Sequence, residues 1–214
     1  MSKKIYISPS SQTENVYATG NTNEAVQCRK IAKACSDFLT KAGFNVKCGM
    51  GGDMYKRVSD SNEFGADLHV AIHTNATVNH NLTGGTRIYL YKTTGEHKKV
   101  GECVLKQLAP ITTGNVNEGL VKNTSFYEIK NANALTVYIE AEFHDTKKGS
   151  DFIINNTQAI AEAIARGICD YYDVKFPEAE LYRVQVGAFS NKANADNLLK
   201  QLKAKGFTGY ITKS

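Results

Sequence analysis

Residues 28–48 read CRKIAKACSDFLTKAGFNVKC, and this stretch contains the pattern on which the predicted fold depends. Apolar residues recur there at steps of three and four, which is typical of one buried helix face: Cys28, Ile31, Ala32, Cys35, Phe38, Leu39 and Ala42. Gly43 ends this helix, and one of the polar residues 21–23 can cap its start. Residues 44–48 then form a strand. A helix followed at once by a strand indicates an α/β chain.

The same alternation continues on both sides of this stretch. Further strands are expected over residues 4–7, 67–72, 86–91 and 135–139. Further helices are expected near residues 58–64 and over 96–108 and 151–172. Strands that alternate with long helices predict an α/β fold with a twisted, mostly parallel sheet flanked by helices on both faces. Ligands of such sheets gather at the carboxyl ends of the strands.

A change in composition divides the chain near Pro177. Residues 1–175 form the predicted main domain, and the proline and acidic residues of 176–180 are typical of a linker. Residues 181–214 then show a small βαβ pattern, with a strand over 181–190, a helix over 191–205 and a strand over 209–212. A unit of this size is too small to bury a core alone, since chains below about 40 residues usually need help.

Composition excludes several classes of protein. The chain has 214 residues, of which 42% are hydrophobic and 22% charged, values typical of a globular protein rather than a disordered or collagen-like one. The net charge of +5 favours an acidic partner, but the basic residues form no dense cluster with aromatic spacing, so we expect no nucleic-acid partner. No apolar run approaches the roughly 18 residues of a membrane span, so no membrane partner is expected.

The five cysteines and the first residues suggest where the chain is made. The cysteines form no CxxC pair and their number is odd, which favours free thiols in a reducing compartment. Cys28 and Cys35 are expected in the core. The first nine residues contain no apolar signal core, so we expect synthesis in the cytoplasm without a signal peptide.

Three polar residues are predicted to meet at the edge of the sheet. His73 ends the third expected strand, Glu140 ends the buried strand of residues 135–139, and Glu24 opens the first long helix on its buried face. An acid in a first helical turn is often only a response to the helix dipole, and a buried histidine is often only a hydrogen-bonded core residue. Together, however, an imidazole and a carboxylate supply two ligands of a catalytic zinc, and a second carboxylate can act as general base. The spacing therefore favours a metal-dependent hydrolase.

Three segments resemble the zinc-dependent N-acetylmuramoyl-L-alanine amidases. Residues 71–76 (AIHTNA) resemble the family's S-I-H-x-N-A segment, and residues 66–68 match its A-D lead-in. Residues 136–143 (TVYIEAEF) resemble the strand A-V-L-V-E-x-G-F, whose glutamate is the catalytic one. Residues 21–24 (NTNE) occupy the place of the second-ligand glutamate. The resemblance spans roughly residues 3–172 and keeps the motifs in the family's order.

This resemblance implies a reaction and a site. Glu24 and His73 would bind Zn²⁺, Glu140 would be the general base, and Asn75 would contact substrate. The activated water would cleave the amide bond between N-acetylmuramic acid and the L-alanine of the stem peptide. The chain would then be an endolysin or autolysin with bacterial peptidoglycan as its partner.

One motif departs from the family's pattern. The first strand normally ends D-P-G-H-G-G, with the histidine as first ligand, whereas residues 8–12 here read SPSSQ. A gapless overlay places Ser11 at the histidine position, and a one-residue slip places Gln12 there. We expect Gln12 as a weak third ligand, with Ser11, water or another residue as the alternatives.

Two further histidines do not clearly replace the missing ligand. His69 lies about 13 Å from His73 along the strand, and His144 can either face the cleft or form hydrogen bonds on the solvent side. The lost histidine therefore leaves a second reading open, in which the chain is a weak or inactive peptidoglycan-binding protein with a degenerate zinc site. The intact Glu140 argues against that reading.

The C-terminal residues resemble the first half of a SPOR domain. The similarity lies in residues 182–190 (YRVQVGAFS), Ala195 and residues 202–207 (LKAKGF). The resemblance implies binding to peptidoglycan, particularly to glycan strands stripped of peptide. Because only half of the repeated βαβ unit is present, we expect two chains to pair their tails in a homodimer. Release by a phage holin or by cell lysis would bring the protein to the wall.

Overall fold

The computed structural model describes residues 2–77, 84–114, 119–178 and 184–213. It contains two compact units, Met1–Pro177 and Glu178–Ser214. Within the described residues, no helix is both long and apolar enough to cross a membrane. Each unit is described by itself below.

The first unit is built on a sheet that has six strands in the described part of the chain. The strands are β1 (Lys4–Pro9), β2 (Asn45–Cys48), β3 (Leu68–Asn75), β4 (Arg87–Leu90), β5 (Leu120–Lys122) and β6 (Leu135–Phe143). Their order is β2-β1-β3-β6-β4-β5, and all pairs are parallel except β4 with β6. The expected mostly parallel α/β sheet is confirmed. The short strand β5 was not predicted from the sequence.

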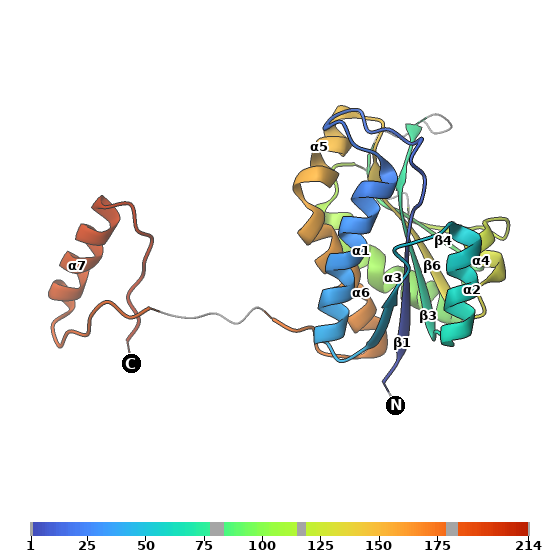
Figure 1. Ribbon diagram of the computed structural model, residues 1–214. Helices are drawn as coiled ribbons and strands as arrows, with labels where there is room; N and C mark the ends of the chain where they lie inside the picture. The colour runs from blue at the N-terminus through green and yellow to red at the C-terminus, as the bar shows by residue number, and fades with distance from the viewer. Residues whose placement is uncertain (1, 78–83, 115–118, 179–183, 214) are drawn as a thin grey trace. The chain divides into compact units, whose positions relative to one another are not determined.

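Helices cover both faces of the sheet (Figure 1). One face carries α1 (Glu24–Lys41), α3 (Gly95–Leu108) and α6 (Thr157–Tyr172), and the other carries α2 (Met54–Phe64) and α4 (Tyr127–Asn131). Every second side chain of β3 and β6 points toward α1, α3 and α6 and packs against the buried faces of these helices. This layer holds the main apolar core, and Cys28 and Cys35 lie in it as expected.

The opposite face of the central strands is also buried and carries polar side chains beside a smaller apolar cluster around Ala71 and Tyr138. His69 and His73 of β3 alternate with the core residues Val70 and Ile72, so they point toward the α2 and α4 side. The ring of Tyr6 stacks on His69 with centroids 5.6 Å apart, and Tyr138 stacks on His73 at 4.3 Å. Buried polar groups are stable only when they are hydrogen-bonded, so this face needs specific partners.

Several boundaries differ from those expected. β3 and β6 run on to Asn75 and Phe143, so His73 and Glu140 lie within strands rather than at their ends. The expected helix over residues 151–172 is two helices, α5 (Lys147–Asn155) and α6, with Asn156 between them. Asn156 has a non-helical backbone conformation, with φ −121° and ψ 25°, and its side chain donates a hydrogen bond to the Phe152 carbonyl at 2.8 Å.

Phe176 belongs to the first unit, not to the linker expected over residues 176–180. Its ring lies 5.5 Å from that of Phe38, and the Arg166 guanidinium lies 4.0 Å above it. The boundary between the units falls after Pro177. An aromatic ring with a packing partner stays in the core although its neighbours in sequence are polar.

The second unit contains the helix α7 (Lys192–Ala204), which Asn191 caps by accepting a hydrogen bond from the Ala193 amide at 2.8 Å. The strands expected on both sides of it are not formed in the described residues 184–190 and 207–213, and residues 181–183 lie outside the described part of the chain. A strand needs a neighbour for its backbone hydrogen bonds. The side chains that would cover such a sheet are exposed: Val184, Val186, Phe189, Phe207, Tyr210 and Ile211.

Candidate active site

Glu24 enters the site from the start of α1. The Asn23 side chain caps this helix by accepting a hydrogen bond from the Val26 amide at 3.0 Å. The first helical turn thus turns Glu24 inward, where it is only 1% exposed. Its Oε1 lies 2.9 Å from His73 Nδ1, and its Oε2 accepts a hydrogen bond from Asn15 Nδ2 at 2.5 Å. Burial alone would raise the pKa of Glu24, but these hydrogen bonds and the charge of His73 lower it.

His73 and Glu140 are brought together by the register of the sheet. They are paired residues of the neighbouring strands β3 and β6, and both side chains are buried. Paired residues of adjacent strands lie about 5 Å apart. The structure therefore brings Glu24, His73 and Glu140 into one cluster, as the sequence predicted.

Glu140 is the carboxylate of the cluster with spare hydrogen-bonding capacity. In the described part of the chain, its Oε2 is buried without a hydrogen-bond partner. Burial raises the pKa of Glu140 to about 8, with the charges of His73 and Arg87 opposing the shift and that of Glu24 adding to it. A carboxyl group with a pKa near neutrality is suited to proton transfer in both directions.

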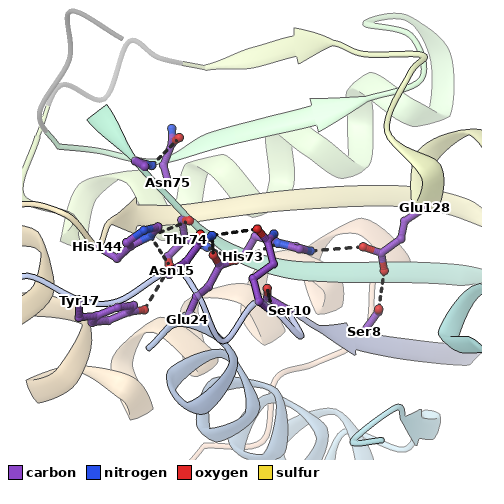
Figure 2. Close-up of polar contacts among 12 residues, drawn as sticks. Ser8, Ser10, Asn15, Tyr17, Glu24, His73, Thr74, Asn75, Glu128 and His144 are labelled. Carbon is purple, nitrogen blue, oxygen red and sulfur yellow. Dashed lines mark hydrogen bonds and ion pairs between the residues drawn. The ribbon is translucent and has the colours of Figure 1, made fainter. Parts of the chain in front are cut away.

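Glu128 is a site residue that the sequence reasoning missed. It extends from α4, and its Oε2 lies 3.3 Å from His73 Nε2 (Figure 2). Its Oε1 lies 3.2 Å from His69 Nε2 and accepts a hydrogen bond from the Ser8 hydroxyl. The helix α4 is only five residues long and was not predicted. A usable indication was present, because two histidines four apart on one buried strand face require a polar partner.

His73 thus lies between two carboxylates (Figure 2). Burial disfavours its charged form, but hydrogen bonds and charges from Glu128 and Glu24 outweigh burial and raise the pKa of His73 to about 10. The same contacts with His69 and His73 lower the pKa of Glu128 against the effect of its burial. The two carboxylates therefore favour the imidazole form with a proton on both nitrogens, and a cation at Nδ1 would take the place of the proton there.

Gln12 lies at the edge of the same cluster. Its Oε1 accepts a hydrogen bond at 2.9 Å from Asn15 Nδ2, the same amide group that donates to Glu24. Gln12 and Ser11 also line a cleft of about 390 Å³ together with His73 and Glu128. The remaining residues that line this cleft are Glu14, Asp53, Met54, Tyr55 and Arg57.

The acidic, histidine and cysteine side chains do not by themselves complete a metal site. No group of three or more of them that could hold a metal ion is found among the described residues. In the described part of the chain, two such donor atoms meet here: His73 Nδ1 and Glu24 Oε1. Among the described residues, a third protein donor on this side would come from a neutral group such as the Gln12 amide.

Asn75 is the last residue of β3, and His144 directly follows β6. Asn75 Oδ1 accepts a hydrogen bond from the Ala76 amide at 2.9 Å, while its Nδ2 is buried without a partner in the described residues. His144 is buried rather than on the solvent side, with Nδ1 at 3.0 Å from both the carbonyl and the hydroxyl oxygen of Thr74. Its ring stacks on Tyr17 with centroids 5.4 Å apart. His144 therefore braces the strand that carries His73.

Solved structures with a similar fold include N-acetylmuramoyl-L-alanine amidases. An N-acetylmuramoyl-L-alanine amidase from Clostridium difficile 630 superposes with a TM-score of 0.70 at 22% identity, covering 80% of this chain and 97% of that one. The catalytic domain of CwlV from Bacillus (Paenibacillus) polymyxa gives a TM-score of 0.69 at 20% identity, covering 81% of this chain and 99% of that one. These similarities show the fold.

Sequence relatives and family assignments cover nearly the whole chain. The sporulation-specific N-acetylmuramoyl-L-alanine amidase of Bacillus subtilis is 27% identical over 220 residues, which covers 97% of this chain and 84% of that protein. Residues 178–214 match the SPOR domain, which binds peptidoglycan, and residues 5–170 match the N-acetylmuramoyl-L-alanine amidase family. The chain is an enzyme that hydrolyses peptidoglycan. With more than half of its length matched, it belongs to the N-acetylmuramoyl-L-alanine amidase family.

Proposed function

We propose that this amidase cleaves its substrate at a Zn²⁺ site held by Glu24 and His73, with Glu140 as general base. The observation that carries the proposal is the convergence of Glu24 Oε1 and His73 Nδ1, 2.9 Å apart and buried. A carboxylate oxygen and an imidazole nitrogen are preferred zinc donors. The donor pair fits the metal on which the family generally depends.

Gln12 is proposed as the third protein ligand. Its amide oxygen is tied to Glu24 through the shared Asn15 amide group, and its side chain lines the cleft beside His73. A neutral amide oxygen is a weaker zinc donor than an imidazole. We therefore infer a site that holds zinc less tightly than a site with two histidines and one glutamate.

When bound, Zn²⁺ would lower the pKa of a water molecule and polarise the scissile carbonyl group. Glu140 would take the proton of the attacking water on its unpartnered Oε2. The bond that breaks joins the lactyl carbonyl carbon of muramic acid to the nitrogen of L-alanine. Glu140 would then pass the proton to that nitrogen as it leaves as an amine. The Tyr138 ring, stacked on His73, keeps water from that face of the imidazole.

Asn75 is proposed to bind the substrate. Its Nδ2 group is buried and has no partner among the described residues. It can therefore donate a hydrogen bond to a carbonyl oxygen of the muramoyl-peptide. Such a donor at the end of β3 would orient the chain of the substrate relative to His73, two residues earlier on the same face.

The experiment that tests the reaction is mass spectrometry of purified Gram-positive peptidoglycan after incubation with the protein. The expected products are free peptides that begin at L-alanine. Glu140→Gln, which keeps the shape of the side chain but cannot accept the proton, should release them at least about 100-fold more slowly. Release at the wild-type rate by this variant would contradict the role of Glu140. No release by either protein, even with added zinc, would favour a wall-binding protein with a degenerate site.

We further propose that the C-terminal units of two chains associate. α7 has no buried residue within its own unit, and the flanking segments expose Val184, Phe189, Phe207 and Tyr210. A second copy of the same half-unit would supply both the strand neighbours and the apolar cover that the unit lacks.

We also propose that the protein is made in a reducing compartment and reaches the wall when the cell is opened, by a phage holin or by lysis. The five cysteines are free thiols, and three of them are buried, which agrees with synthesis in the cytoplasm. Activity found in the medium of intact, growing cells would contradict this proposal.

A further inference from the structure

The polar contacts on the α2 and α4 side of the sheet form one continuous row. Ser61 Oγ lies 2.9 Å from His69 Nδ1, and His69 Nε2 lies 3.2 Å from Glu128 Oε1. Glu128 Oε2 then lies 3.3 Å from His73 Nε2, and the opposite ring nitrogen of His73 faces Glu24. Figure 2 shows Glu128 and Glu24 on different sides of the His73 ring. The row therefore joins α2, β3, α4 and α1 through the imidazole of His73.

The chemistry of Glu128 fixes which nitrogen of His73 carries hydrogen. An ionised carboxylate can only accept hydrogen bonds, so the nitrogen that faces it must be N–H. With Nε2 protonated toward Glu128, the lone pair that is available to a cation is that of Nδ1, the nitrogen beside Glu24. Carboxylates behind metal-binding histidines act in this way, holding the tautomer and the orientation of the ring.

We propose that Glu128 is a positioning residue that orients His73 for metal binding, and that His69 and Ser8 hold Glu128 in place. This inference rests on the zinc site proposed above. Glu128 would not touch the metal or the substrate reaction centre; it acts through His73. It is the member of the row that decides the tautomer, because it is the carboxylate that faces Nε2.

The fixed geometry of Glu128 supports this role. Its side chain is 3% exposed, and both of its oxygens are engaged, Oε1 by His69 and Ser8 and Oε2 by His73. Two contacts at one oxygen and one at the other leave the carboxylate little freedom to rotate. Burying an ionic group costs folding free energy. Proteins with apolar residues of similar volume in its place are often as stable or more stable. Stability alone therefore does not account for a carboxylate at this position.

The test compares Glu128→Gln with a matched control, Glu142→Gln. Glu142 is also a buried carboxylate, and it accepts hydrogen bonds from the amides of Gly85 and Thr113 rather than from His73. Both substitutions replace a buried, hydrogen-bonded carboxyl group by an amide and should lower the melting temperature. Only Glu128→Gln should weaken zinc binding, by about 10- to 100-fold in Kd, as measured by competition with a chromogenic chelator.

A spectroscopic measurement on the zinc-loaded protein separates positioning from general destabilisation. In ¹⁵N–¹H correlation spectra of the histidine side chains, wild-type His73 should show an Nε2–H proton shifted far downfield by the carboxylate. This resonance should move upfield in Glu128→Gln and stay in place in Glu142→Gln. His73→Ala identifies the signal by its loss.

A second variant covers the case in which Glu128→Gln does not fold. The double variant His69→Phe, Glu128→Val removes both members of the His69–Glu128 pair, so that no charge is left at either position, while His73 keeps its contact with Glu24. It should fold and should also bind zinc at least about 10-fold more weakly than the wild type.

The outcomes distinguish this inference from the proposed function. Zinc binding that is lost in His73→Ala and unchanged in both Glu128 variants would overturn the positioning role and leave the zinc site intact. Equal weakening by Glu142→Gln would also overturn it. Wild-type protein that binds no zinc would overturn the zinc site and the positioning role together.

Discussion

Glu24 and Glu140 are both buried carboxylates, yet their pKa values move in opposite directions. Glu24 has hydrogen-bond partners in His73 and Asn15, which stabilise its ionised form. Glu140 has an oxygen without a partner in the described residues, and burial raises its pKa to about 8. The environment thus separates a carboxylate whose ionised form is stabilised from one that can exchange a proton near neutral pH.

Gln12 is the residue of the site that departs most from the family's motif, and its role can be tested by restoring the imidazole. Gln12→His should tighten zinc binding by about tenfold or more, because an imidazole is the stronger donor. Chelator competition measures the change. Gln12→Ala should weaken binding, whereas Glu14→Gln, which alters another residue of the same cleft, should leave the Kd within about threefold. An unchanged Kd in Gln12→His would exclude residue 12 as a ligand.

At the scale of the elements, the long helices and the buried strands could be predicted from apolar periodicity, but their short neighbours could not. α1 was expected from its three- and four-residue spacing and begins at Glu24 as required. β5 has three residues and α4 has five, too few for a period to emerge. Glu128 was missed for that reason, since it is placed by α4 and held by residues distant in sequence.

The polar face of the sheet explains another difference between expectation and structure. His73 and Glu140 were expected at strand ends because polar residues seldom continue a buried strand. In the structure β3 and β6 continue past them, and the His73 side chain has partners in Glu128, Glu24 and Tyr138. Local sequence could not show these partners.

The close packing of α3 on α6 depends on a glycine and provides a test of the fold. A Cβ atom at Gly167 would lie 2.5 Å from Val104 Cα and 2.8 Å from the Cys103 carbonyl oxygen, both of them backbone atoms. Gly167→Ala should therefore destabilise the first unit by about 1–3 kcal/mol, as overpacking does. Urea unfolding measures the free energy. Gly51→Ala is the control, because apart from its chain neighbours no atom of the described residues lies within 4 Å of its added Cβ; equal effects of the two substitutions would contradict the packing described.

At the scale of the whole molecule, the chain combines a catalytic unit that has its own core with a C-terminal unit that has almost none. The buried apolar residues lie within Met1–Pro177. The helix of the SPOR unit was predicted, but the flanking strands were not formed, since strand formation depends on a neighbour that one half-unit does not provide. Sequence periodicity reports which residues can form a strand, not whether a partner is present.

Association through this unit predicts a concentration-dependent mass. Multi-angle light scattering at micromolar concentration should give a dimer for the full chain and a monomer after deletion of residues 178–214. Phe189→Ser, which removes one exposed apolar side chain of the unit, should shift the equilibrium toward monomer, while Val16→Ser, an exposed apolar residue of the first unit, should not. A full-length monomer at this concentration would contradict the proposed pairing.

Glu24 and His73 are proposed to hold one catalytic zinc ion beside Glu140. The measurement that tests it most directly is the zinc content of the dialysed protein by elemental mass spectrometry, with wild type, His73→Ala and Glu140→Gln measured side by side. We expect about one zinc per chain in the wild type and in Glu140→Gln, and none in His73→Ala. Zinc retained in full by His73→Ala, or absent from the wild type after exposure to the metal, would contradict the account.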